Sequence, residues 1–281
     1  MTKTIAFLTL WRDNEKILDR SLSQLETMED ELIPKGYRFT YAFLENDSKD
    51  ETAMRLYKWL RERRGFLISE QIDAPKWGSV ALTERTRWLA RYRNVCLAAL
   101  DFWKYDYLVV ADSDVHFKPD LLTQMVDHLD QNPDWGMITP NTVQNVADHV
   151  GETDLPSYFD SWTLIDKQQM QGMTFAANPF LSSHDREDWE KGHPISVYSA
   201  FGSIAMIRGE IPQEYEVHWN AEVGCEHTGL CEDITKIGYE IIVDPKLHAE
   251  IIHEEPVIPD PAVVKMHQDR LKLAEASTLF E

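Results

Sequence analysis

The stretch Tyr107-Leu-Val-Val-Ala-Asp112-Ser-Asp114 joins a short apolar run to two carboxylates that are two residues apart. An unbroken apolar run is typical of a central parallel strand, because helices cover both faces of a parallel sheet. Two carboxylates at the end of such a strand can turn toward one cation, and oxygen ligands of this kind suit Mg²⁺ and Mn²⁺. We therefore predict that Asp112 and Asp114 are metal ligands. The alternative is a solvated turn that caps the following helix.

Predicted strands and helices alternate along the first half of the chain. Each apolar run is followed by a segment in which apolar residues have helical spacing. This alternation predicts an α/β fold with a Rossmann-like, mainly parallel sheet that is flanked by helices. We predict strands at 5–10, 39–44, 66–71, 107–111 and 137–139, and helices at 13–33, 48–64, 83–103 and 119–129.

The pattern changes after about residue 140. Residues 141–195 show little periodicity and many polar and aromatic side chains, and long segments of this kind are usually functional or mobile. We expect residues 1–281 to form a single domain with two functional halves, 1–140 and 141–281. In the second half we predict strands at 197–207 and 239–243 and helices at 222–237 and 263–276.

Polar residues follow the first two predicted strands, at the carboxyl ends where parallel sheets bind their ligands. Thr9 and Arg12 lie at the end of the first strand, and Glu45 and Asp47 follow the second. A carboxylate in the second turn could accept hydrogen bonds from a base or a ribose. The alternative is a plain turn that caps the next helix.

The charge of the chain restricts its partners. The formal net charge is −20 and the isoelectric point about 4.8. Such a surface repels phosphate backbones, so we expect no nucleic-acid partner. A polyanionic ligand would need a bound cation or a local group of basic residues, and Arg85, Arg87, Arg91 and Arg93 form such a group. We favour Arg87 and Arg93 as phosphate ligands; surface ion pairs are the alternative.

Two later residues are candidates for chemistry. Glu226, in the segment Gly224-Cys-Glu-His227, could act as a base toward an acceptor or stabilise a developing positive charge. We predict it as the catalytic residue. His253 follows a short apolar run, and a neutral imidazole there could complete a metal site that two carboxylates begin, so we prefer it to His248 as third ligand. A structural or surface role is the alternative.

The first residues indicate a strand rather than a targeting signal. A single Lys precedes a short apolar run, and no small-residue cleavage site follows. No apolar run approaches the ~20 residues of a membrane span. Three cysteines without a secretory signal indicate reduced thiols. We expect a cytoplasmic protein without a transmembrane segment.

The order of these motifs resembles that of GT-A glycosyltransferases. The turn Glu45-Asn-Asp-Ser-Lys-Asp-Glu-Thr52 is similar to the N-G-S-x-D-G-T turn of that fold, and Arg93-Asn94 to its Arg-Asn donor-site element. The chain resembles Cap59-like fungal α-1,3-mannosyltransferases more closely, over about its first two-thirds. The similar segments are 14–18, 45–52, Leu89-Ala-Arg-Tyr-Arg-Asn94, Asp114-Val-His-Phe117 and Tyr158-Phe-Asp-Ser-Trp162, with Asp166.

The resemblance implies a donor, a cation and an acceptor. The donor would be a nucleotide-sugar, with GDP-mannose the first choice and a UDP-sugar the second, held by residues 1–140. The cation would be Mn²⁺ or Mg²⁺, and residues 141–281 would bind a glycan acceptor. Tyr158, Asp160 and Trp162 would shape a sugar pocket, and Trp162 and Trp219 could stack on sugar faces. The implied donor contacts are Thr9, Arg12, Glu45, Asp47, Arg87, Arg93, Asp112 and Ser113.

Two other functions remain open. A sugar-phosphate nucleotidyltransferase also uses a carboxylate pair at a strand end, but it would have a Gly-rich phosphate loop after the first strand. Here Leu10 is followed by Trp-Arg-Asp-Asn. A catalytically inactive carbohydrate-binding protein on the same fold is the second alternative.

Overall fold

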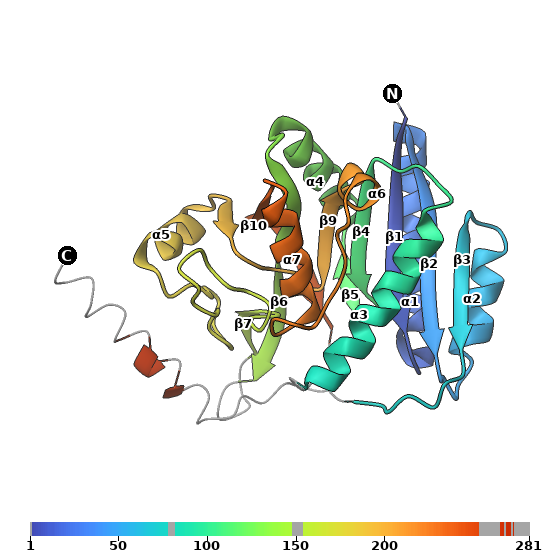
Figure 1. The fold of residues 1–281 in the computed structure, drawn as a ribbon, viewed down its shortest axis with the longest axis horizontal. Coiled ribbons are helices and arrows are strands. Elements are labelled where there is room, and N and C mark those ends of the chain that lie inside the picture. The colour runs from blue at the N-terminus through green and yellow to red at the C-terminus, as the bar shows by residue number, and fades with distance from the viewer. Residues whose placement is uncertain are drawn as a thin grey trace.

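The computed structural model describes residues 2–77, 82–147 and 154–252, together with residues 265, 266, 268–270 and 272. A mixed sheet forms its centre, with helices on both faces (Figure 1). The strands of the described part are ordered β3-β2-β1-β4-β9-β6-β10-β5, with β7 beside β6 and β8 beside β10. The strands are β1 (Lys3–Trp11), β2 (Tyr37–Asn46), β3 (Gly65–Glu70), β4 (Tyr107–Asp112), β5 (Val115–Phe117), β6 (Trp135–Ala147), β7 (Asp154–Tyr158), β8 (Ile195–Val197), β9 (Ile204–Arg208) and β10 (Glu240–Ile251).

Helices cover the sheet in two layers, and each layer has its own apolar core. One core packs the helices α1, α2 and α4 on one face, and the other packs α3 and α7 on the opposite face. Helix α1 illustrates how the sequence produces this packing. Its apolar residues recur at helical spacing, and all of them on this face are buried: Leu18, Leu22, Leu25, Met28 and Leu32. Each such side chain stabilises the fold by about 1.5–3 kcal/mol. The helices are α1 (Glu15–Leu32), η1 (Ile33–Lys35), α2 (Thr52–Leu60), α3 (Thr83–Leu100), α4 (Pro119–Gln131), α5 (Ser183–Lys191), α6 (Glu210–Glu214) and α7 (Glu226–Lys236).

The first half of the sheet is parallel, as predicted. Strand β1 pairs in parallel with β2 and β4, and β2 pairs in parallel with β3. The carboxyl ends of these strands therefore lie at one edge of the sheet. Strand β4, which carries Asp112, lies in the interior of the sheet between β1 and β9 and is buried up to its last residue.

Beyond β4 the sheet is mixed. Strand β9 runs antiparallel to β4 and β6, whereas β10 is parallel to β6. The predicted strand 197–207 was wrong, because β8 ends at Val197 and β9 begins only at Ile204. Gly202 and Ser203 between them have φ of 60° and 58°, a left-handed conformation that interrupts a strand.

Other boundaries also differ from the predictions. Strands β6 and β10 have 13 and 12 residues and so continue well past Thr139 and Val243. Helix α7 begins at Glu226 rather than at residue 222, since Gly224 has φ of 69°. The predicted helix 263–276 lies mostly outside the described residues.

Residues 141–195 contain more regular structure than their sequence suggests. Strand β7 pairs antiparallel with β6, and Ser182 caps α5 by accepting the Asp185 N–H. The ring of Tyr158 packs against Trp189 with centroids 5.7 Å apart. In the described part, no helix combines the length and the apolar composition that crossing a bilayer requires.

Candidate functional site

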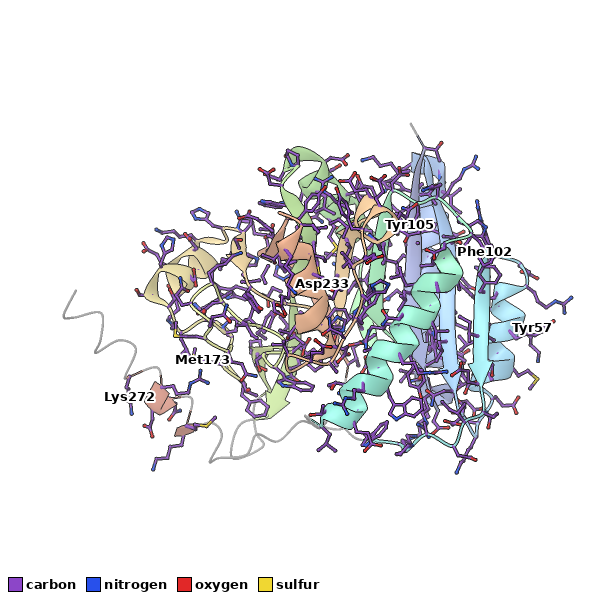
Figure 2. The ribbon with its side chains drawn as sticks, viewed as in Figure 1. Tyr57, Phe102, Tyr105, Met173, Asp233 and Lys272 are labelled. Carbon is purple, nitrogen blue, oxygen red and sulfur yellow. The ribbon has the colours of Figure 1, made fainter. Side chains whose placement is uncertain are left out.

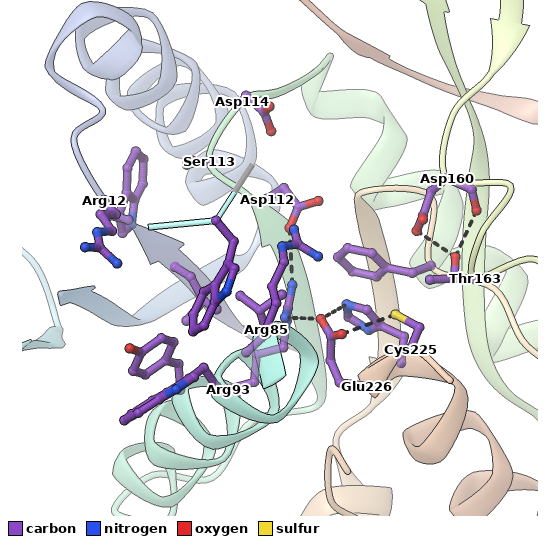
Figure 3. Close-up of a pocket in the computed structure, with 18 of the residues that line it drawn as sticks. Arg12, Arg85, Arg93, Asp112, Ser113, Asp114, Asp160, Thr163, Cys225 and Glu226 are labelled. Atoms are coloured by element: carbon purple, nitrogen blue, oxygen red, sulfur yellow. Dashed lines mark hydrogen bonds and ion pairs between the residues drawn. The ribbon is translucent and has the colours of Figure 1, made fainter. Parts of the chain in front are cut away.

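A cavity of about 450 Å³ opens at the carboxyl ends of β1 and β4 (Figure 3). Its walls come from β1, α3, the turn after β4, residues 159–163 and the start of α7. Six of the predicted site residues line this cavity: Arg12, Arg93, Asp112, Ser113, Asp114 and Glu226.

Arg93 connects three elements at the floor of the cavity. It lies on α3 and is buried, with 4% of its surface exposed. Its Nη1 donates to Glu226 Oε1 at 2.5 Å, and its Nη2 donates to Asp112 Oδ1 at 3.3 Å. One guanidinium therefore ties the end of β4 to the start of α7, and its charge balances part of the acidic floor.

Glu226 is held by several donors. Besides Arg93, the thiol of Cys225 donates to Oε2 at 3.2 Å. The residue begins α7, where the helix N-terminus also favours negative charge. Both carboxylate oxygens of Glu226 therefore already accept a hydrogen bond.

His227 adds a further polar contact to Glu226. Its Nδ1 accepts the indole N–H of Trp219 at 3.3 Å, so the neutral ring carries its proton on Nε2, which lies 3.7 Å from Glu226 Oε1. Burial first, and the nearby charge of Arg93 second, hold the pKa of His227 well below its usual value. Phe201 stacks on the ring at 3.6 Å between centroids and fixes its orientation.

The segment Asp112-Ser113-Asp114 forms the wall opposite α7. The pKa of Asp112 is raised to about 6: burial is the largest cause, the charge of Arg93 opposes it, and the charges of Asp114 and Glu226 add to it. The hydroxyl of Ser21 donates to the Ser113 carbonyl at 2.7 Å and so fixes the turn. Asp112 and Asp114 both face the cavity (Figure 3).

The donor set for a cation consists of these two carboxylates. Within the described ranges, no three His, Cys, Asp or Glu side chains lie close enough together to hold a metal ion. Two carboxylates are nevertheless the usual protein contribution to a Mg²⁺ site that also uses phosphate oxygens. His253, the predicted third ligand, lies outside the described residues.

Asp160 is a third acidic group on the cavity wall. It has φ of 66°, and the Thr163 hydroxyl donates to its Oδ2 at 2.6 Å. Burial raises the pKa of Asp160 to about 7; the Thr163 hydrogen bond opposes this, and the charges of Asp112 and Glu226 add to it. Trp162 lines the cavity beside it, whereas Tyr158 and Trp219 are buried behind the wall.

The end of β2 and the turn after it build the site indirectly. Glu45 is fully buried and accepts the Ser48 N–H and the Ser69 hydroxyl, both at 2.7 Å. Asp47 accepts three backbone N–H groups, those of Ile72, Asp73 and Ala74, at 2.8–3.0 Å. Neither Glu45 nor Asp47 lines the cavity.

Arg12, which lines the cavity, also holds the loop at residues 72–75 that Asp47 binds. Arg12 donates to the carbonyls of Ala74 and Pro75 at 2.8 and 3.0 Å. Burial alone would raise the pKa of Asp47, but its hydrogen bonds outweigh burial and lower it. Arg12 and Asp47 thus shape the wall at Pro75, Lys76 and Trp77.

The remaining predicted residues lie elsewhere. Thr9 is buried and lies beneath the Ser113 turn, beside a much smaller cavity. Arg87 is exposed and does not line the cavity, whereas Arg85 lines it. The helical repeat could have identified Arg85, because positions 85, 88, 89, 92 and 93 share one face of α3.

Comparisons with known proteins agree with this fold. Residues 4–233 match the family described as cryptococcal mannosyltransferase 1. No curated protein sequence matches the chain. The chain is similar to the structure of the mannosyltransferase PcManGT from Pyrobaculum calidifontis in complex with GDP-Man and Mn²⁺, with a TM-score of 0.52 and 14% identity over 100% of this chain and 65% of that chain.

Two further solved structures are similar. GalNAc-T7 with UDP, GalNAc and Mn²⁺ has a TM-score of 0.54 and 11% identity, over 96% of this chain and 48% of that one. TarS of S. aureus has a TM-score of 0.52 and 12% identity, over 97% and 39%. The chain thus spans less than two-thirds of the length of these proteins. At such identities the similarity establishes the fold, a mixed α/β fold of the GT-A type, and confirms that prediction.

Proposed function

Because the chain belongs to the glycosyltransferase family described as cryptococcal mannosyltransferase 1, we propose that it transfers a sugar, with mannose the first choice, from a nucleotide-sugar to a hydroxyl of a glycan acceptor. The observation that carries this proposal is the bridge from Arg93 to Asp112 and Glu226 at the floor of a cavity that also contains Asp114. This arrangement combines cation ligands with an organised positive charge, as departure of a diphosphate requires.

The donor would occupy the part of the cavity that residues 1–140 build. Arg12, Lys76, Arg85 and Arg93 supply positive charge there, and Asp112 and Ser113 complete this side. Aromatic rings of Trp77, Trp88 and Tyr92 offer apolar faces to a base. We propose GDP-mannose as the first donor to test and UDP-sugars as the second, since the similar structures carry GDP-Man or UDP.

We propose that Asp112 and Asp114 hold Mn²⁺ or Mg²⁺ together with oxygens of the donor diphosphate. When bound, such a cation would neutralise the diphosphate and help it to leave. Arg93 keeps Asp112 in place for this role, and the Ser21 hydrogen bond keeps the backbone of the turn in place.

The acceptor would enter from the side of residues 141–281. Asp160 and Trp162 lie on that wall, and we propose that they contact sugar hydroxyls and a sugar face. Glu226, which we predicted as the catalytic residue, is better suited to positioning Arg93, because its oxygens already accept from Arg93 and Cys225.

Donor cleavage tests the proposal. We expect the protein to release GDP from GDP-mannose in the presence of Mn²⁺, and Asp114→Ala to abolish this release. Asp120→Ala is the matched control, because Asp120 is an exposed carboxylate on α4 that does not line the cavity. Pyrophosphate released from a nucleoside triphosphate and a sugar phosphate would instead support a nucleotidyltransferase. If no nucleotide-sugar raises the melting temperature even with Mn²⁺, the proposed function is wrong.

A further inference from the structure

The outer edge of β3 is open. Strand β3 is the terminal strand of the sheet and pairs with β2 on one side; within the described ranges no strand pairs with its other side (Figure 1). Proteins commonly protect such an edge with Lys, Pro or a bulge. The sequence of β3, Gly-Phe-Leu-Ile-Ser-Glu, contains neither Lys nor Pro. An open edge with apolar side chains is a template for another strand.

The hydrogen bonds to β2 show which groups face outward. The Tyr41 N–H donates to the Arg64 carbonyl, and the Asp47 N–H donates to the Glu70 carbonyl. The even-numbered residues of β3 therefore direct their backbone groups toward β2. Because these groups alternate along a strand, Gly65, Leu67 and Ser69 direct N–H and C=O to the open edge.

The side chains around this edge are apolar and exposed. Phe66 stacks on Trp103 with centroids 4.6 Å apart, and Phe102, which is 79% exposed, packs against Phe66 at 5.8 Å. Tyr57 on α2 is 58% exposed. Figure 2 shows Phe102 and Tyr57 on the same side of the molecule, beside β3 and α2. These residues leave an apolar surface next to the open backbone.

We propose that the open edge of β3 pairs antiparallel with the same edge of a second copy of this chain, so that one sheet continues through a two-fold dimer. The charge pattern argues for a second copy rather than another partner. With Leu67 facing the second copy's Leu67, both strands overlap fully and all outward backbone groups of 65–69 are paired. In this register Arg64 faces the second copy's Glu70 at both ends, where the Glu70 carboxylate also accepts from Arg91 of its own copy, and Phe66 faces Ile68.

Opposite charges directly across an antiparallel pair stabilise it, and apolar pairs do the same. The strand is thus complementary to itself in backbone hydrogen bonding and in charge. Long-range repulsion is also smallest in this half of the chain. Residues 1–140 carry 19 Lys and Arg against 23 Asp and Glu, whereas residues 141–281 carry 9 against 25.

This dimer leaves the candidate site accessible. Antiparallel pairing reverses the strand direction in the second copy, so the carboxyl ends of the two sheet halves point to opposite ends of the dimer. The cavity lies at those carboxyl ends, and each copy therefore keeps its own opening. The proposal is independent of which reaction the cavity performs.

Analytical ultracentrifugation of the full chain tests the dimer. We expect a concentration-dependent monomer–dimer equilibrium for the wild type and an affinity at least about tenfold weaker for Arg64→Glu, which places like charges opposite each other at both ends. Arg61→Glu is the matched control, because Arg61 is also exposed and the substitution is the same, but it precedes the strand. A wild type that remains monomeric at its highest soluble concentration, or equal effects of the two substitutions, would overturn the proposal.

A cross-link tests the register independently. Facing residues in a hydrogen-bonded antiparallel pair have Cα atoms about 5.5 Å apart, within the range of a disulfide. Leu67→Cys should form a disulfide-linked dimer under mild oxidation, because the three native cysteines are buried. Asp127→Cys, exposed on α4, should not cross-link. Equal cross-linking of both variants, or of neither, would contradict the register.

Discussion

The guanidinium of Arg93 donates to Glu226 Oε1 at 2.5 Å, although the residues are 133 positions apart in the chain and both are buried. The same guanidinium reaches Asp112, so the ion pair couples the packing of α3 and α7 to the position of a proposed cation ligand. Loss of one partner of a buried ion pair leaves the other charge uncompensated, which costs about 3–5 kcal/mol.

We predict that Glu226→Gln lowers the free energy of unfolding by about 3 kcal/mol, because Arg93 loses its closest anion. Urea unfolding measures this change. Arg93→Met should have a similar effect. The double variant Arg93→Met/Glu226→Gln should lose less than the two single variants together, since it removes both charges of this pair and only Asp112 loses a contact with Arg93. Additive losses would show that the pair is not coupled.

The carboxyl of Asp160 gives the protein a defined pH dependence. Its folded pKa of about 7 is above the unfolded value of about 3.9, so the folded state holds the proton more tightly. This contribution to stability is complete below about pH 4 and is lost as the pH rises through about 7. Asn at this position cannot titrate. We therefore predict that the melting temperature of Asp160→Asn rises relative to that of the wild type as the pH increases from about 4 to about 7. Asn also tolerates the positive φ of this position. A constant difference between the two proteins from about pH 4 to about pH 8 would contradict the assignment.

The opposite sign holds for Asp47. Its pKa is lowered by hydrogen bonds from Asn46 and from three backbone N–H groups, which outweigh the effect of burial. Its contribution to stability is therefore present above about pH 4 and is lost as the pH falls. We predict that Asp47→Asn costs at least about 2 kcal/mol at neutral pH, because an amide cannot accept all of these bonds. This cost should be smaller at acidic pH, and thermal unfolding of both proteins at neutral and at acidic pH measures the difference. Asp73→Asn is the control, because Asp73 lies in the same loop but its side chain is exposed and the loop uses only its backbone N–H to bind Asp47.

Much of the fold was predictable from the sequence, and the reasons are local. Continuous apolar runs such as that before Asp112 identify buried strands, and the spacing of Leu18, Leu22 and Leu25 identifies α1. The break between β8 and β9 was not predictable, because Ser203 adopts a left-handed conformation that its residue type does not require. The lengths of β6 and β10 depend on pairing between segments about 100 residues apart.

The residues of the candidate site also fall into two groups, those that the sequence predicts and those that it does not. Asp112, Asp114 and Arg93 follow from strand ends and helix spacing, and all three line the cavity. The roles of Glu45 and Asp47 could not be predicted in this way. The sequence places both residues at a strand end, but it does not show that the carboxylate of Asp47 accepts hydrogen bonds from backbone N–H groups of another loop. Sequence position alone cannot separate a ligand contact from a residue that holds the loop carrying it.

Metal removal tests the acidic pair directly. We predict that GDP binds with Mn²⁺ much more tightly than after chelation of the metal, and that Asp114→Ala removes this difference while preserving the melting temperature within a few degrees. Titration calorimetry measures the binding without relying on turnover. GDP binding that is equally tight with and without Mn²⁺ would refute the proposed role of Asp112 and Asp114.

Arg85 and Arg87 offer the sharpest test of the cavity as the donor site. Both lie in the first turns of α3, but Arg85 lines the cavity and Arg87 is exposed to solvent. A hydrogen bond to a charged group contributes about 1.5–3 kcal/mol, so Arg85→Ala should raise the KM for the donor by about tenfold or more. Arg87→Ala removes the same side chain two residues away and should leave KM within about twofold of the wild type. Steady-state kinetics on the preferred nucleotide-sugar distinguishes the two. A larger effect of Arg87→Ala would mean that the donor binds outside this cavity and would support Arg87 as a donor contact.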